Sequence, residues 1–125
     1  MNKGKVFVVA SVAAVLFAGS AFAHHTRAHF DRTQEITVTG NVVEYHLVNP
    51  HAWVYLDVPG EGGQVMKWAL ETNGNVNQLV RVNWSQDSLT PGDTVKVIVN
   101  PLKDGSRGGL LVSVELPDGT VLSGE

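Results

Sequence analysis

Histidine is the side chain most able to do metal chemistry in this 125-residue sequence, which has five histidines and no cysteine. His46 and His51 flank a short stretch that ends in Asn49-Pro50, a pair typical of turns. If the chain reverses there, the two imidazoles lie nearly opposite each other on neighbouring strands, with Cβ atoms about 4.5–5.5 Å apart. Such a pair can share one Cu²⁺ or Zn²⁺ ion, to which Glu44 would add an oxygen ligand. In the alternative interpretation His51 only caps the turn and His46 is solvated.

Three more histidines, His24, His25 and His29, lie near the start of the sequence. If a leader is removed after Ala23, His24 supplies a free amine and an imidazole, a nitrogen-rich set that suits Cu²⁺. The same arrangement is typical of the histidine brace of oxidative copper enzymes, which needs a third nitrogen from elsewhere in the fold. The alternative is a polar tail that binds metal opportunistically.

Aromatic and sulfur-containing side chains form a third group of candidates: Trp53, Tyr55, Met66 and Trp68. If Trp53 and Tyr55 point outward, they form a stacking patch suited to a sugar, an aromatic compound or a protein partner. If they point inward, they fill the mouth of a barrel or pack beneath the N-terminal residues. Alternation along the sequence leaves both possibilities open, because both faces of these segments carry bulky apolar groups.

Motifs of the common hydrolases and nucleotide-binding proteins are absent from the sequence. It contains no Gly-x-Ser-x-Gly elbow, no His-Glu-x-x-His helix and no phosphate-binding glycine-rich loop. We therefore interpret the protein as a binding protein rather than an enzyme.

The first 23 residues have the pattern of a secretory signal peptide. Lys3 and Lys5 give a basic start, residues 6–18 are an uncharged apolar run, and Ala21 and Ala23 are the small residues expected before a cleavage site. The apolar run is shorter than the roughly 20 residues that a spanning helix needs. The sequence thus predicts cleavage after Ala23, a periplasmic or secreted protein, and no membrane span after cleavage.

The remainder, residues 24–125, is acidic, with seven basic against twelve acidic side chains and a formal charge of −5. Phosphate backbones are bound by clustered Lys and Arg, so this balance argues against a nucleic-acid partner. Residues 24–33 are polar and His-rich without periodicity, which predicts a flexible N-terminal arm.

From residue 34 the sequence changes to β-strand patterning. We expect a long strand over residues 36–47 with a register shift at Gly40, and an alternating strand over residues 51–58. A glycine-rich hairpin turn leads to a third strand, residues 64–71.

A short helix is expected next, because Asn73-Gly74-Asn75 offers an N-cap and Val76, Leu79 and Val80 follow helical spacing. Two further strands, residues 94–101 and 110–116, and a short end at residues 121–122 complete the chain. Three strands, a helix and two strands match the five-stranded OB barrel. We therefore predict an all-β domain with one short helix, an OB-like barrel over residues 34–125; a sandwich is the alternative.

Several motifs of the sequence recur together in one known family. They include Asn-Pro-His-Ala-Trp at residues 49–53, Leu-Asp-Val at 56–58, Pro-Gly-Asp at 91–93, Lys-Asp-Gly-Ser at 103–106, Pro-Asp-Gly at 117–119 and His24-His25. With them the chain resembles the small exported bacterial proteins of domain-of-unknown-function family 6152. The resemblance covers nearly all of residues 24–125 and implies an exported protein with an OB-like fold; it points to no particular biochemical activity.

The sequence leads to one main functional hypothesis and two alternatives. His, Met and Trp on the early strands are similar to periplasmic copper chaperones, but only one Met follows residue 23, so a copper site here would use histidine and Cu²⁺. The main hypothesis is a binding module for copper(II) or zinc at His46 and His51, assisted by the N-terminal histidines. The alternatives are a metal-free interaction module that docks an envelope protein partner through Trp53 and Tyr55, and a histidine-brace enzyme.

Overall fold

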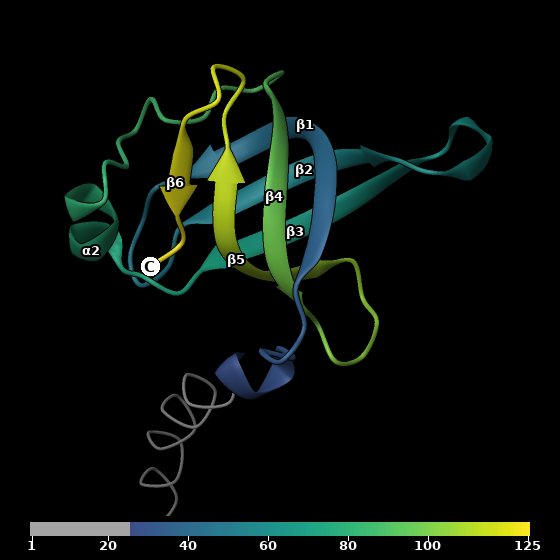
Figure 1. Cartoon of the computed structure of the whole chain (residues 1–125), viewed down its shortest axis with the longest axis horizontal. Helices are drawn as coiled ribbons and strands as arrows, with labels where there is room; N and C mark the ends of the chain where they lie inside the picture. Colours follow the sequence, from purple (N-terminus) through teal and green to yellow (C-terminus); the bar gives the residue numbers. More distant parts are fainter. Residues whose placement is uncertain (1–25) are drawn as a thin grey trace, which may run out of the picture.

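The computed structural model describes residues 26–125, and this part folds into a closed β-barrel with one short α-helix (Figure 1). The predicted OB-like fold class is confirmed. The predicted signal peptide, residues 1–23, and His24 and His25 lie outside the described residues. No helix within residues 26–125 has the length and apolar character needed to cross a membrane.

The barrel is built from the first five of six strands in the described residues. These are β1 Ile36–His46, β2 Trp53–Pro59, β3 Val65–Thr72, β4 Thr94–Pro101, β5 Gly108–Glu115 and β6 Val121–Ser123. The 3-10 turns η1 Thr26–His29 and η2 Glu61–Gly63 precede β1 and β3, and the helix α2 Val76–Arg81 connects β3 to β4. The sheet order is β3-β2-β1-β4-β5-β6, and a parallel pairing of β3 with β5 closes it.

Two consecutive glycines allow β5 to pair with strands on both sides. A Cβ on Gly108 would lie 2.7 Å from the carbonyl oxygen of Ala69 on β3, and one on Gly109 would lie 2.5 Å from that of Asn100 on β4. Both distances are shorter than a non-bonded contact permits. The absence of side chains at these positions therefore lets the barrel close.

The core is formed by the inward side chains of alternating strands. Along β2 and the residue before it, Ala52, Val54 and Leu56 are at most 1% exposed, and the residues between them are partly exposed. The same alternation buries Val95, Val97 and Val99 on β4. Full burial of such a side chain contributes roughly 1.5–3 kcal/mol, so these rows fix the register of the strands.

The bulge in β1 lies three residues after the predicted position. Val42 pairs with Leu56 and Glu44 with Tyr55, so Val43 is the additional residue and Gly40 stays in register. A Cβ on Gly40 would lie 2.7 Å from the backbone oxygen of Asp57. The prediction of a register shift at Gly40 is therefore wrong, because this glycine serves a close approach between β1 and β2.

The helix α2 begins as predicted, with Asn75 as N-cap. The Asn75 side chain accepts a hydrogen bond from the Gln78 amide while the Gln78 side chain accepts one from the Asn75 amide. Leu79 is fully buried, but Val80 is 52% exposed. With only six residues, the helix presents a narrow apolar stripe to the barrel.

The N-terminal segment contacts the barrel from His29 onward. The His29 carbonyl accepts from the Lys103 amide at 2.8 Å, and the Asp31 amide donates to the Pro101 carbonyl at 2.8 Å. Phe30 is only 8% exposed and forms an isolated bridge with Leu102. Instead of a freely flexible arm, the structure therefore shows residues 29–31 anchored at the end of β4, because Phe30 supplies an apolar contact there.

The two glycines of β5 make closure of the barrel testable. We expect Gly108→Ala to lower the free energy of unfolding by about 2–3 kcal/mol, because the new Cβ collides with β3 backbone. Gly63→Ala is the control, since its Cβ meets nothing and only the φ of +76° is strained, at about 1 kcal/mol. Urea denaturation followed by circular dichroism measures both; equal losses would contradict the proposed role of Gly108.

Candidate functional site

The outer face of β2 and β3 holds most of the side chains able to bind a ligand. Because Ala52, Val54 and Leu56 point into the core, Trp53, Tyr55 and the neighbouring Asp57 point outward. This resolves the orientation that the sequence left open. In OB folds the surface of strands two and three is the usual ligand-binding face.

Aromatic rings form a row across this face. Trp53 and Tyr55 lie with ring centroids 6.1 Å apart and planes only 13° from parallel. The His46 ring stands edge-on to Tyr55, with centroids 6.2 Å apart and an interplanar angle of 78°. Such a row offers a broad, rigid and partly exposed apolar surface.

Met66 and Trp68 do not belong to this row, which corrects the predicted patch of four side chains. The β2–β3 register pairs Trp53 with Glu71 and Tyr55 with Ala69. Met66 and Trp68 occupy the intervening positions of β3 and therefore alternate to the other side, where Trp68 packs against the core. The side chains that β3 adds to the outer face are Val65, Lys67, Ala69 and Glu71.

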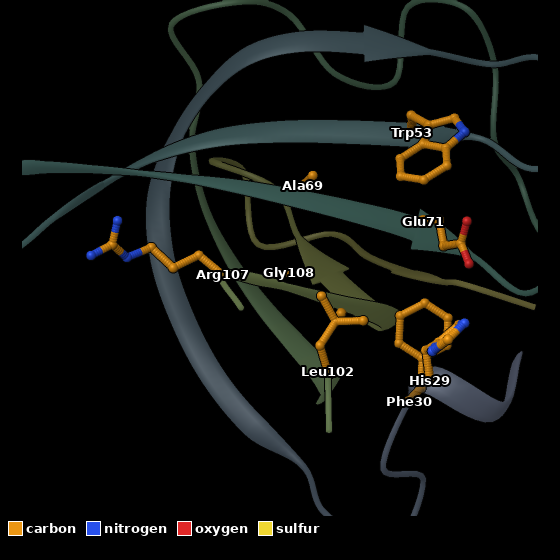
Figure 2. Close-up of a pocket in the computed structure, with 9 residues that line it drawn as sticks. His29, Phe30, Trp53, Ala69, Glu71, Leu102, Arg107 and Gly108 are labelled. Atoms are coloured by element: carbon orange, nitrogen blue, oxygen red, sulfur yellow. The ribbon is translucent and has the colours of Figure 1, made fainter. Parts of the chain in front are cut away.

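Beside Trp53 the face is hollowed by a cavity of about 250 Å³ (Figure 2). Its walls come from the N-terminal segment, β2, β3, the β4–β5 loop and the start of β5. The lining residues are His29, Phe30, Trp53, Ala69, Glu71, Leu102, Arg107, Gly108 and Gly109. Most of these groups are apolar, so the few polar groups present determine what the cavity can hold.

Glu71 is the buried ionisable group of this cavity. The residue is 7% exposed, and burial raises the pKa of its carboxyl, while the positive charges of His51 and Arg27 act in the opposite direction. Figure 2 shows the carboxylate between the indole of Trp53 and the rings of Phe30 and His29, with Arg107 directed to the opposite side of the view. Glu71 thus gives an apolar cavity one acidic end.

The Asn-Pro-His-Ala-Trp motif forms the loop that positions this end of β2. The Asn49 side chain accepts a hydrogen bond from the Val76 amide at 3.0 Å, joining the loop to the first turn of α2. The Ala52 amide donates to the Thr72 hydroxyl and the Ala52 carbonyl accepts from the Thr72 amide, each at 3.0 Å. These bonds fix the loop next to β3, so that Trp53 and Glu71 meet across the strands.

The described histidines do not form the predicted cross-strand pair. His46 pairs with Trp53 in the sheet, whereas His51 lies before the start of β2 and has a buried Nδ1 without a hydrogen-bond partner in residues 26–125. His46 Nε2 lies 3.1 Å from Glu44 Oε2, so the expected proximity of these two side chains is confirmed. Within the described residues, no three His, Asp or Glu side chains are grouped to hold a metal ion.

Sequence reasoning missed Glu71, Phe30 and Arg107. Glu71 carried a detectable signal, since it is an acidic residue in the apolar end of a predicted strand. The other two carried none, because Phe30 stands in a polar segment and Arg107 in a turn, and only the folded chain brings them to the same cavity.

The fold and this face define a small OB-type barrel with an aromatic outer surface on β2. The model of the family described as "Family of unknown function (DUF6152)" matches residues 11–113, and the chain belongs to this family. Among solved structures, the chain is similar to the mitochondrial single-stranded DNA binding protein Rim1 of S. cerevisiae. That match has 14% identity and a TM-score of 0.48, and it covers 67% of this chain and 94% of the other. No curated protein matches the sequence.

The raised pKa of Glu71 predicts a pH-dependent stability. The folded state binds the Glu71 proton more tightly than the unfolded chain, so the native protein loses stability as pH rises from 4.5, the usual value, through the raised pKa. Glu71→Gln removes this loss, and we expect the variant to be more stable than the native protein at pH 7.5, with the difference vanishing below pH 4.5.

Urea denaturation between pH 4 and pH 8 measures this difference. The control is Glu44→Gln, a 61% exposed side chain on the same face, which should change the stability by no more than about 0.5 kcal/mol. If the free energy of unfolding changes with pH in the same way in Glu71→Gln and in the native protein, burial does not raise the pKa of the Glu71 carboxyl.

Proposed function

We propose that this chain is a small exported binding protein that holds its ligand on the outer face of β2 and β3. The observation that carries the proposal is the parallel pair of Trp53 and Tyr55, partly exposed and 6.1 Å apart, beside a cavity of about 250 Å³. Flat apolar groups, such as an aromatic compound or the face of a sugar ring, stack on such a pair.

Further features of the molecule support a ligand face here. A second hollow of about 410 Å³, lined by Tyr55 and Lys67 among others, adjoins the first through Ala69 and Arg107. Charged groups at the margin, including the Lys67–Asp57 pair at 3.1 Å, can orient a ligand whose apolar part rests on the rings. Support for export comes from the basic start, apolar run and small residues of positions 1–23.

Removal of the Trp53 ring tests this proposal. We expect Trp53→Ala to weaken binding of indole or cellobiose, used as probes, at least tenfold, because each stacked ring contributes about 0.5–1.5 kcal/mol beyond its buried area. Ligand-observed NMR measures the affinities, and Val121→Ala, an exposed position on β6, is the control. The proposal fails if neither probe binds the native protein or if Trp53→Ala binds both equally well.

A transition metal is the second candidate ligand, supported by the exposed His46 and Glu44 side chains. Their Nε2 and Oε2 atoms lie 3.1 Å apart on one strand face, and imidazole with carboxylate is a ligand pair that Cu²⁺ and Zn²⁺ accept. We rank this candidate below the aromatic face because the described residues provide two adjacent ligands here and His51 lies apart from them. The additional ligands would be the N-terminal histidines His24, His25 and His29. The brace enzyme, the weaker alternative, would use the amine and ring of His24 with a third nitrogen from His46 or His51.

Calorimetric titration with Cu²⁺ and Zn²⁺ tests the metal hypothesis. If His46 and Glu44 take part, His46→Ala should weaken binding at least tenfold, and affinity should fall as pH decreases, since protons compete for imidazole nitrogens. His51→Ala should have a smaller effect, because His51 is outside the pair. Binding weaker than about 10 µM, roughly 7 kcal/mol, or loss of binding only on removal of residues 24–29, would exclude the strand site.

A further inference from the structure

We infer that the cavity beside Trp53 takes an organic cation, an alkylammonium group that pairs with the Glu71 carboxylate and packs against the neighbouring aromatic rings. This inference rests on the proposed function and names the ligand class of the same face. It follows from the burial of Glu71 and from the groups that line the cavity around it.

Among the described residues, no side chain pairs with the carboxylate of the buried Glu71. The residue is 7% exposed, yet no hydrogen bond or salt bridge within residues 26–125 engages its carboxylate oxygens. A buried carboxylate is costly unless it is paired and hydrogen-bonded. Because Glu71 lines an open cavity, a bound cation can supply the missing charge and donors.

The remaining walls favour an organic cation over a hydrated metal ion. Trp53 and Phe30 place aromatic rings on either side of the carboxylate in Figure 2, and ring faces attract alkylammonium groups. Leu102, Ala69 and Gly108 complete an apolar lining that offers no further carboxylate. A metal ion would find one oxygen-bearing side chain there, whereas methyl or methylene groups on nitrogen would find apolar contacts throughout.

Basic side chains lie around the cavity, but none of them fills the space beside the Glu71 carboxylate where the cation would bind. Arg27 and His51 act on the Glu71 carboxyl through their charge alone, and Arg27 is exposed. Arg107 extends to the opposite side of the cavity from Glu71, and His29 lies on the exposed N-terminal segment. Arg27 and Arg107 bear the same charge as the ligand, so the cation binds where the Glu71 carboxylate and the aromatic rings attract it more strongly than these two side chains repel it.

Cation binding should depend on pH in a defined direction. A cation favours the ionised form of Glu71, so affinity should rise as pH rises through the raised pKa of this carboxyl. The other ionisable groups that face this carboxyl or line its cavity are Arg27, His29, His51 and Arg107. Only the part of the pH dependence that disappears in Glu71→Gln belongs to Glu71.

A titration with choline, followed by tryptophan fluorescence and amide NMR shifts, tests the inference. The neutral isostere 3,3-dimethylbutan-1-ol has the same shape without the charge. We expect the native protein to bind choline at least tenfold more tightly than the isostere, and Glu71→Gln to lose this preference. Glu61→Gln, which changes an exposed carboxylate in η2 outside this cavity, should keep it.

The outcomes separate this inference from the proposed function. Equal affinity for choline and its isostere in the native protein overturns the cation site, whether or not the variants fold. A choline preference that survives in Glu71→Gln also overturns it. If indole still binds in a Trp53-dependent manner in either case, the aromatic ligand face stands and only the ligand class is wrong.

Discussion

The parallel pairing of β3 with β5 closes the barrel, and the rest of the structure depends on it. Gly108 and Gly109 allow this contact, because a side chain at either position would overlap the backbone of β3 or β4. Closure also forms the candidate site, since Gly108, Gly109 and Ala69 line the cavity beside Trp53. The same backbone contact thus completes the hydrogen bonding of β3 and creates the surface on which a ligand can rest.

The loop between β1 and β2 connects this surface to the core. Asn49 caps the start of α2, Ala52 is fully buried and bonded to Thr72, and Trp53 turns outward beside Glu71. Within these five consecutive positions, Asn49 and Ala52 hold the loop in place and Trp53 faces outward. The Asn-Pro-His-Ala-Trp segment therefore positions one aromatic ring beside one carboxylate, and it does not bring His51 opposite His46.

Strand alternation and turn chemistry predicted most of the fold but little of the site. The alternation of apolar and polar residues on β2 and the N-cap of α2 could be predicted, because each depends only on residues that are close together in the sequence. The bulge at Val43 and the separation of His46 from His51 depend on the register in which β1 pairs with β2 on one side and with β4 on the other. The outward position of Trp53 depends on which row of side chains the barrel buries, and alternation alone does not fix that choice.

The sequence by itself determined an all-β domain with a helix between the third and fourth strands, because hydrophobic periodicity and turn residues act locally. It also determined the acidic balance of residues 24–125 and the absence of cysteine. Only the tertiary structure decided that Glu71 is buried beside Trp53, with Phe30 as the facing wall. These residues are separated along the chain, and their meeting depends on barrel closure and on the register of three strands.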